Sequence, residues 1–400
     1  MKIRRQLPVH SPISFTSLLA GLRVLLFGNG DQARDAVRKL IFDFYRPLDL
    51  ILTDSGTSAL TLALGSACER VGRKLVALPA YCCYDVATAA DGAGVEVVLY
   101  DVSPDTLGPV LDSLAAALTH KPAAVVLAHL YGVPIDFDTI LPLIAKTDAL
   151  LVEDAALGHG ASYRGRPLGA FGSLSVLSFG RGKGVTGGSG GALLANDVAG
   201  ASVLKDCVPK VGPADRGFGT IMATAAQWLV GRPLLYWLPA SLPFLKLGET
   251  IYKPTHAPIS MSAAATAILA KNWRLASSEA EERKSNGAQL YTIVEDLDGV
   301  QQPLVKSECE AGYLRFPLVV DDELLPPFRT TGARRLGIMP GYPTSLIDLE
   351  GFTGRCRTTD CECSAARNLA NNLFTVPTHG KRNNKDLREL RGWLKATQRS

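Results

Sequence analysis

The first residue type with chemical potential is a lysine in a loop rich in glycine. Lys183 stands in the stretch SFGRGKGVTGGSGG, residues 178–191, where it has few bulky neighbours. It fits three uses: a solvated surface lysine, the lysine of a nucleotide phosphate loop, or an amine that condenses with a carbonyl group. The phosphate loop requires Gly, four residues and then Gly-Lys-Ser/Thr. Leu177 and Gly184 occupy two of those fixed positions, so the phosphate loop is excluded and two uses remain.

Two other polar groups follow apolar runs that are typical of buried strands. The residues SGTS, 55–58, come after LDLILT and open a helical pattern. The free N–H groups and the dipole at a helix N-terminus attract phosphate. Glu153 and Asp154 end a second apolar run. Ligands of doubly wound sheets bind beyond the carboxyl ends of the strands, so we expect both groups to lie near Lys183.

A phosphate site, a strand-end carboxylate and a reactive lysine together fit one cofactor. Pyridoxal 5′-phosphate needs an anion site, an amine for its aldehyde and an acid partner for its ring nitrogen. A lysine that is released by a substrate amine can then transfer protons. The sequence therefore predicts a pyridoxal phosphate enzyme with a Schiff base at Lys183.

The elements that would position these groups form an α/β pattern. Short runs rich in Val and Leu alternate with helical patterns, which is typical of a mostly parallel sheet flanked by helices. We expect a large α/β domain over residues 1–255 and a smaller C-terminal α+β domain over 256–400. The predicted strands of the sheet are 48–53, 74–79, 94–102, 122–130, 149–155, 174–179 and 190–195.

Composition excludes several classes of protein. The chain has 400 residues, of which 47% are hydrophobic and 20% charged, as in ordinary globular proteins. A net charge of +4 gives no support for nucleic-acid binding. The spacing of Cys356, Cys361 and Cys363 matches no standard zinc or iron–sulfur pattern, so no metal is expected. The N-terminus lacks the features of a cleavable signal peptide, and we expect a cytoplasmic protein with free thiols, including Cys82 and Cys83.

The stretch 222–247 is apolar and aromatic, but Arg232 and three prolines interrupt it. A spanning helix needs about 20 uninterrupted apolar residues, so this stretch does not predict one. Two interpretations remain open. It can be buried at a domain or dimer interface, or it can face a membrane surface or a lipid-linked substrate.

In their order and spacing, these motifs resemble the DegT/StrS family of sugar aminotransferases, which are pyridoxal phosphate enzymes of fold type I. The resemblance covers most of the chain. Members of this family are typically homodimers with active sites at the subunit interface. It implies that Lys183 forms the Schiff base and that Asp154 partners the ring nitrogen. The segments that carry it include SGTSALTLAL, PAYCCYDVATAADGAGVEVVLYDV, HLYGVPIDFDTI, LLVEDAALGHGASYRGRPLGAFGSLSVLSFGRGKGVTGGSGGALLAN and LFTVPTHGKRNNKDLREL.

The resemblance also assigns the remaining cofactor contacts. Thr57, Ser58 and Ser178 fall on phosphate ligands, and Gly56 lets the backbone approach the phosphate closely. Cys83 stands where the family commonly has an aromatic ring that stacks on the cofactor.

Tyr84 follows Cys83 in the sequence, and both residues are expected to contact the cofactor. Leu157 replaces a glutamine that reaches the phenolic oxygen. His129 and His159 lie near strand ends, where we expect structural hydrogen bonds.

The expected activity is transfer of an amino group from an amino acid, with glutamate as donor, to a keto sugar that is nucleotide-linked. Two alternatives stay open. One is an enzyme of the same fold that dehydrates a sugar or acylates an amine. The family's dehydratases have histidine in place of the lysine, so Lys183 argues against dehydration. The other is a non-catalytic binding or regulatory protein.

Overall fold

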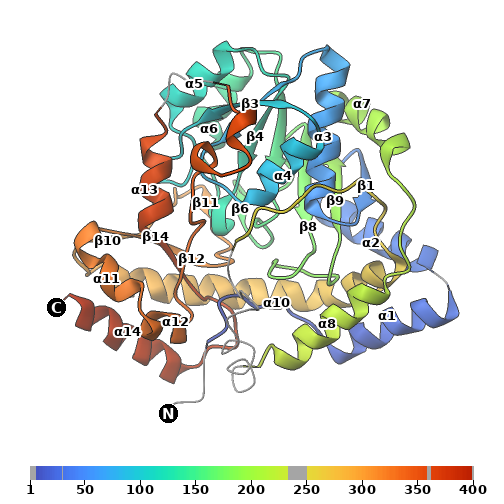
Figure 1. Cartoon of the computed structure of the whole chain (residues 1–400). Coiled ribbons are helices and arrows are strands. Elements are labelled where there is room, and N and C mark those ends of the chain that lie inside the picture. Colours follow the sequence, from blue (N-terminus) through green and yellow to red (C-terminus); the bar gives the residue numbers. More distant parts are fainter. Residues whose placement is uncertain (1–5, 29, 233–249, 358–361, 399–400) are drawn as a thin grey trace.

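The structure is a computed structural model that describes residues 6–28, 30–232, 250–357 and 362–398 (Figure 1). Its centre is a seven-stranded sheet in which β9 runs against both of its neighbours and the other six strands run in one direction. The predicted mostly parallel sheet is therefore confirmed. In spatial order its strands are β1 (Asp49–Thr53), β9 (Gly191–Ala195), β8 (Leu174–Ser178), β5 (Leu150–Asp154), β4 (Ala124–Ala128), β2 (Leu75–Pro79) and β3 (Glu96–Tyr100).

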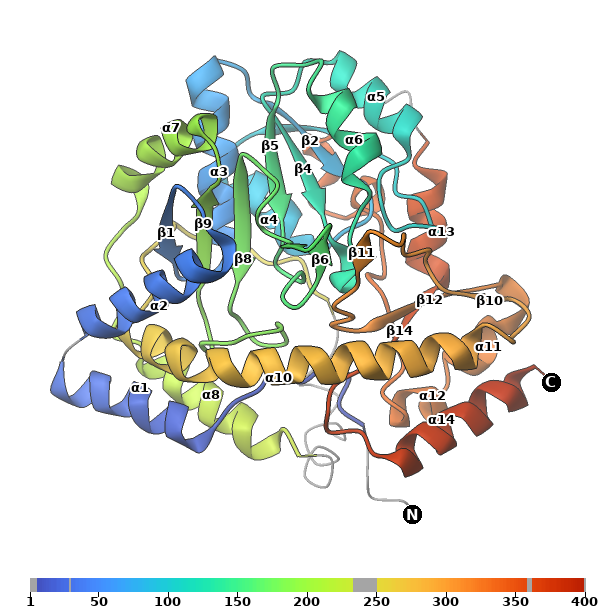
Figure 2. The same ribbon diagram turned by 180° about the vertical axis from the view of Figure 1, so that it is seen from behind.

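Helices cover both faces of this sheet. The side chains of β2 and β9 are buried along their whole length, as expected for strands enclosed on two sides. Helices α3, α4 and α7 lie on one side (Figure 1), and α2 and α6 lie on the other (Figure 2). The helices of this part of the chain are α1 (Phe15–Phe27), α2 (Gly30–Tyr45), α3 (Gly56–Val71), α4 (Tyr84–Gly92), α5 (Leu111–Thr119), α6 (Phe137–Ile144), α7 (Val198–Cys207) and α8 (Phe218–Val230).

The C-terminal part is built on one long helix, α10 (Ala263–Val294). The Ser262 side chain caps its N-terminus by accepting a hydrogen bond from the Ala265 N–H at 3.2 Å. The last helix, α14 (Asn384–Thr397), starts with a capping box between Asn383 and Asp386. The other helices here are α11 (Leu325–Phe328), α12 (Thr331–Arg335) and α13 (Ser364–Asn372).

Two smaller sheets complete the fold. An antiparallel sheet has the order β10 (Val300–Gln301), β12 (Phe316–Val320), β14 (Leu373–Val376) and β13 (Met339–Pro340). A short one has the order β11 (Cys309–Glu310), β6 (Ser162–Tyr163) and β7 (Arg166–Pro167).

The buried hydrophobic residues form one large cluster and one smaller cluster, besides a group of three residues around Ile268. The smaller cluster gathers residues of α10, β12, β14 and α14, whereas the large one also takes in Phe352 and Leu369 from the C-terminal part. The proposed domain boundary at residue 255 stays a prediction.

Helix α10 passes below the carboxyl edge of the main sheet, and α1 and α8 lie beneath it (Figures 1 and 2). It packs against α1, α2 and α8. This arrangement places the loop between β8 and β9, which carries Lys183, between the sheet and α10.

Candidate active site

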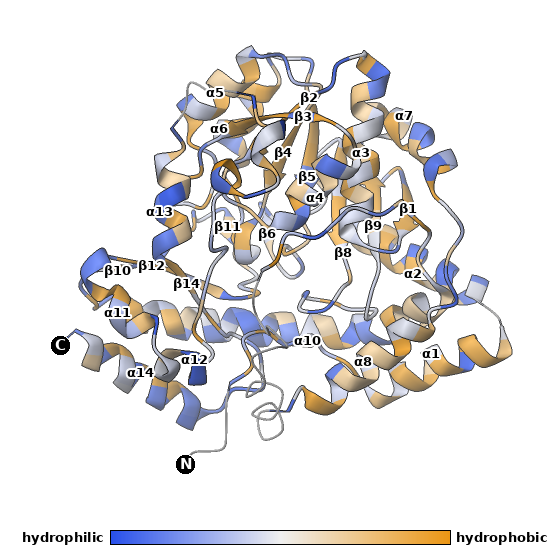
Figure 3. Cartoon of the chain, in the orientation of Figure 1, coloured by the Kyte–Doolittle hydropathy of each residue, from blue (hydrophilic) through white to orange (hydrophobic). Residues whose placement is uncertain are grey.

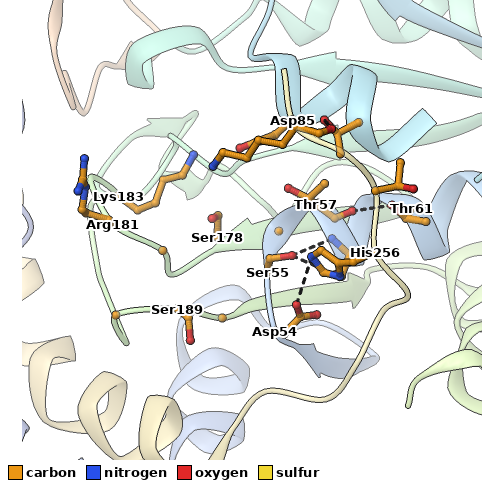
Figure 4. Close-up of a pocket in the computed structure, with 18 of the residues that line it drawn as sticks. Asp54, Ser55, Thr57, Thr61, Asp85, Ser178, Arg181, Lys183, Ser189 and His256 are labelled. Carbon is orange, nitrogen blue, oxygen red and sulfur yellow. Dashed lines mark hydrogen bonds and ion pairs between the residues drawn. The ribbon is translucent and has the colours of Figure 1, made fainter. Parts of the chain in front are cut away.

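A cavity of about 590 Å³ lies at the carboxyl edge of the main sheet (Figure 4). The N-terminus of α3, the loop between β8 and β9, helix α4 and the segment 253–256 form its walls. Five of the residues predicted from sequence line it, although they come from two distant parts of the chain: Gly56, Thr57, Ser58, Ser178 and Lys183.

The N-terminus of α3 forms one wall. Ser55 caps the helix, since its Oγ accepts a hydrogen bond from the Ser58 N–H at 3.1 Å. The first N–H groups of an α-helix have no partner inside the helix and point toward an incoming anion. A Cβ at Gly56 would lie 2.9 Å from the Ser178 Cβ, which is closer than carbon atoms pack. Only glycine therefore lets β8 and the start of α3 meet at this wall.

The loop that carries Lys183 is held from two sides. Ser11, near the N-terminus, donates from its Oγ to the Lys183 carbonyl at 2.9 Å and accepts from the Gly182 N–H at 3.0 Å. On the other side, the Asn272 side chain of α10 donates to the Thr186 carbonyl at 2.9 Å. Gly182 has φ +81°, a conformation that favours glycine. The backbone at Lys183 is thus fixed, while its side chain extends along the cavity.

Asp154 lies next to Lys183 at the end of β5. The two residues line the same small cavity, together with Cys83, Gly56, Thr57 and other side chains. One oxygen of Asp154 accepts from the Ala156 N–H at 3.0 Å. Burial raises the pKa of Asp154 above its ordinary value, while the Ala156 N–H and the Lys183 ammonium act in the opposite direction. A cation placed beside this carboxyl group would stabilise its ionised form.

Glu153, its neighbour in sequence, points to the other face of the sheet. Its carboxylate is fully buried and accepts from His129 Nε2 at 3.0 Å. Further donors are the backbone N–H groups of residues 169, 171 and 172 and the Ser175 hydroxyl. Burial alone would raise the pKa of Glu153, but these hydrogen bonds hold that pKa below its ordinary value. The structural partner expected for His129 is therefore Glu153.

Tyr84, Leu157 and His159, which the sequence analysis also named, do not line either of the two cavities. The Tyr84 ring lies 6.4 Å from the Tyr342 ring, and Tyr84 lines neither of the two cavities. Its contact with a cofactor stays a prediction. Leu157 is also absent from both linings. The hydrogen bond expected for His159 is not seen at Nδ1, which has no partner among the described residues; the ring stacks on Phe44 at 5.9 Å.

The larger cavity has polar lining residues that the sequence did not indicate. They include Asp85, Arg181, Lys253 and His256. The Lys253 carbonyl accepts from the Thr88 hydroxyl at 3.1 Å.

His256 Nε2 lies 3.6 Å from Asp54 Oδ2 (Figure 4). These two contacts hold the segment 253–256 across the cavity. Within the described ranges, no group of three or more His, Cys, Asp or Glu side chains is arranged to hold a metal ion.

The residues fit the predicted cofactor, pyridoxal 5′-phosphate, in four respects. The glycine at position 56 leaves open the space that a Cβ would fill beside Ser178. The buried Asp154 carboxyl group suits a cationic ring nitrogen. The Lys183 amine lies on the same small cavity. Thr57, Ser58 and Ser178 line the larger cavity at the start of α3, where a phosphate would be bound.

Part of the chain is similar in sequence to known proteins. Residues 30–223 match the sequence profile of the DegT/DnrJ/EryC1/StrS aminotransferase family. An L-glutamine:2-deoxy-scyllo-inosose aminotransferase of Micromonospora echinospora is 33% identical over 157 residues, which are 39% of this chain and 37% of that protein. GDP-perosamine synthase of Caulobacter vibrioides is 33% identical over 159 residues, 40% of this chain and 43% of the synthase. The matches thus span well under half the length of these curated relatives.

Solved structures extend the likeness to the whole fold. Helicobacter pylori PseC, an aminotransferase involved in the biosynthesis of pseudoaminic acid, has a TM-score of 0.78 at 15% identity, covering 99% of this chain and 100% of that one. DesI, solved in the presence of its TDP-sugar product, has a TM-score of 0.77 at 21% identity, covering 100% and 94%. The fold is that of the fold type I pyridoxal phosphate enzymes, and residues 30–223, just under half of the chain, are similar in sequence to the DegT/DnrJ/EryC1/StrS aminotransferase family.

Proposed function

We propose that the protein is a pyridoxal phosphate-dependent aminotransferase that moves an amino group from an amino acid to a keto sugar. One observation carries the proposal: Asp154 at the end of β5 and Lys183 in the loop after β8 line one small cavity beside the N-terminus of α3. When bound, the cofactor ring supplies an electron sink for the bonds at the substrate carbon.

In this proposal, Lys183 has two tasks. Its Nζ holds the cofactor in the resting enzyme and, once a substrate amine has displaced it, accepts the proton from the Cα atom of the donor. The glycines on either side of Lys183 leave room for this movement, while the contacts with Ser11 keep the backbone in place.

Asp154 keeps a proton on the ring nitrogen by remaining ionised beside it. The wall of Thr57, Ser58 and Ser178 binds the phosphate, with the α3 dipole as an added attraction. These residues would hold the two ends of the cofactor, and Lys183 lies on the same small cavity as Asp154.

The acceptor that we propose is a sugar linked to a nucleotide. Arg181, Lys253 and His256 line the larger cavity, and basic groups suit the phosphates of such a substrate. The names of two relatives support this class, because one is a GDP-perosamine synthase and the other was solved with a TDP-sugar product.

The amino donor is glutamate in our sequence-based expectation, whereas the inosose aminotransferases are named for L-glutamine. We also propose a homodimer, as in the family that the sequence resembles.

The test uses an isotope label to trace the amino nitrogen from the donor to the sugar product. The purified protein, loaded with pyridoxal phosphate, is incubated with a panel of nucleotide-linked keto sugars and α-¹⁵N-labelled glutamate or glutamine, and the products are analysed by mass spectrometry. We expect a ¹⁵N-amino sugar from the wild type and none from Lys183→Ala. A dehydrated or acylated product would instead favour the alternative enzymes of this fold. No turnover with any donor would support the non-catalytic alternative.

A further inference from the structure

Helices α1 and α8 expose an unusual amount of apolar surface. Eight large apolar side chains on these two helices are between 40% exposed, for Leu22, and 79% exposed, for Phe27. Monomeric soluble proteins rarely leave so many gathered in one place. The eight are Phe15, Leu19, Leu22, Leu26 and Phe27 of α1 and Phe218, Met222 and Leu229 of α8; below we call them the α1/α8 face.

The two helices form one surface. They pack against each other, and the rings of Phe15 and Trp228 lie 5.8 Å apart. Their inner sides are used in packing, where Leu25 and Ile221 contact Ile268 and its neighbours on α10. Figure 3 shows both helices as predominantly hydrophobic along the lower edge of the molecule. The exposed residues therefore belong to sides of α1 and α8 that the rest of the described chain does not cover.

The charged residues within α1 and directly after α8 are arginines. With 20% charged residues overall, a helix of thirteen residues in this chain would have about two or three, yet α1 contains only Arg23 and α8 contains none. Arg232 follows α8, and its guanidinium lies 4.9 Å from the Trp228 ring centre. The acidic residues next in sequence, Asp31 and Asp215, lie beyond the helix ends. The two helices thus offer apolar side chains and arginine, without carboxylates.

This charge pattern distinguishes between two binding partners for the α1/α8 face, a second copy of this chain and an anionic membrane. In a two-fold dimer through the face, both copies would present the same residues, so Arg23 and Arg232 would meet no carboxylate from either helix. Anionic phospholipid head groups complement arginine, and the acyl region accepts the apolar side chains. Aromatic and basic residues at the end of an apolar helix are typical of the membrane interface. No helix in the described ranges is long and apolar enough to cross a bilayer.

We infer that the α1/α8 face binds the surface of an anionic membrane, with α1 and α8 lying in the plane of the interface. The inner side of α8 reaches the candidate active site, because Thr220 Oγ1 lies 2.9 Å from Ser189 Oγ and Ser189 lines the large cavity. Membrane binding would therefore hold this cavity close to the lipid surface. The stretch 222–247, which the sequence analysis singled out, contributes its residues up to Arg232; residues 233–249 lie outside the described part.

The experiment measures how the purified full-length protein partitions onto vesicles by flotation. The vesicles are pure phosphatidylcholine or a 3:1 mixture of phosphatidylcholine and phosphatidylglycerol. We expect the wild type to float with the anionic vesicles and several-fold less with the neutral ones. The variants Leu22→Ser/Leu26→Ser and Phe218→Ser/Met222→Ser should lose at least about tenfold in partitioning, and Arg23→Ala should lose the preference for anionic lipid.

A matched control removes apolar groups that are equally exposed elsewhere. Val198→Ser/Leu304→Ser changes side chains that are 81% and 66% exposed and should float like the wild type. All variants are checked by circular dichroism and light scattering. The inference is overturned if the wild type does not float with anionic vesicles, if the α1/α8 variants float as well as the wild type, or if these variants instead convert a dimer to monomers.

Discussion

Glu153 and Asp154 are adjacent in sequence but point to opposite faces of β5, where their surroundings differ. Glu153 is enclosed by hydrogen-bond donors, including His129 Nε2 at 3.0 Å, and hydrogen bonding lowers its pKa despite burial. Asp154 has one backbone donor and lies on the small cavity with Lys183, and burial raises its pKa. We conclude that Glu153 stabilises the fold and that Asp154 is available for the proposed chemistry.

The first prediction concerns the structural carboxylate. In Glu153→Gln the amide NH₂ would face N–H and O–H donors, so buried donors would lose their partner. We expect the free energy of unfolding to fall by about 3–5 kcal/mol, as measured by denaturant titration. Glu69→Gln is the control, since Glu69 forms an exposed ion pair with Lys210 and should change stability by less than about 1 kcal/mol. Equal losses in both variants would contradict the structural role of Glu153.

The second prediction concerns turnover in Asp154→Asn. An asparagine cannot hold the proton on the ring nitrogen, but Lys183 and the phosphate wall are unchanged. We expect the variant to bind pyridoxal phosphate and to lose about 100-fold or more of its activity, measured by the ¹⁵N-transfer assay. Turnover at the wild-type rate would overturn the role of this carboxyl group.

The third prediction concerns the stability of the same variant without cofactor. Because burial raises the pKa of Asp154 in the folded state, the folded protein binds more protons than the unfolded chain between the ordinary value of 3.8 and that raised pKa. Wild-type stability should therefore fall as pH increases through this window. Asp154→Asn lacks this slope, so at pH 7 it should unfold at a temperature equal to or above that of the wild type. If Asp154→Asn unfolded at a lower temperature than the wild type at every pH, this would contradict the upward shift of the Asp154 pKa.

The fourth prediction concerns the phosphate wall. In Gly56→Ala the new Cβ would lie 2.9 Å from the Ser178 Cβ, so Ser178 or the start of α3 must move. We expect the dissociation constant of pyridoxal phosphate to rise at least about tenfold, measured by fluorescence titration.

Gly65→Ala is the control in the same helix, because its Cβ would meet nothing nearer than 3.8 Å. It should bind like the wild type and be more stable by about 0.5–1 kcal/mol. Unchanged affinity in Gly56→Ala would show that this contact does not shape the phosphate site.

Much of the fold could be predicted because its signals are local. Continuous runs of Val and Leu mark strands that are buried on both faces, and all seven predicted strands form the main sheet. The proximity of Asp154 and Lys183 also followed from sequence, because the carboxyl ends of parallel strands share one edge.

Other features depend on contacts between distant segments. Ser11 contacts Lys183, which is 172 residues away, and nothing in its local sequence indicates this. Lys253 and His256 reach the cavity only because Thr88 and Asp54 hold their segment there. The His159 ring packs against Phe44 and Trp273, which are both distant in sequence, and its Nδ1 has no hydrogen-bond partner among the described residues.

The most direct test of the central claim is a visible absorption spectrum of the protein with pyridoxal phosphate, recorded before and after addition of glutamate or glutamine. We predict an absorption band from lysine-bound cofactor in the wild type, its loss when the donor is added, and its absence in Lys183→Ala but not in Lys39→Ala. A wild-type band that neither donor changes would contradict the proposed transamination with these donors. A band that persists in Lys183→Ala, or no band in the wild type, would contradict the assignment of Lys183.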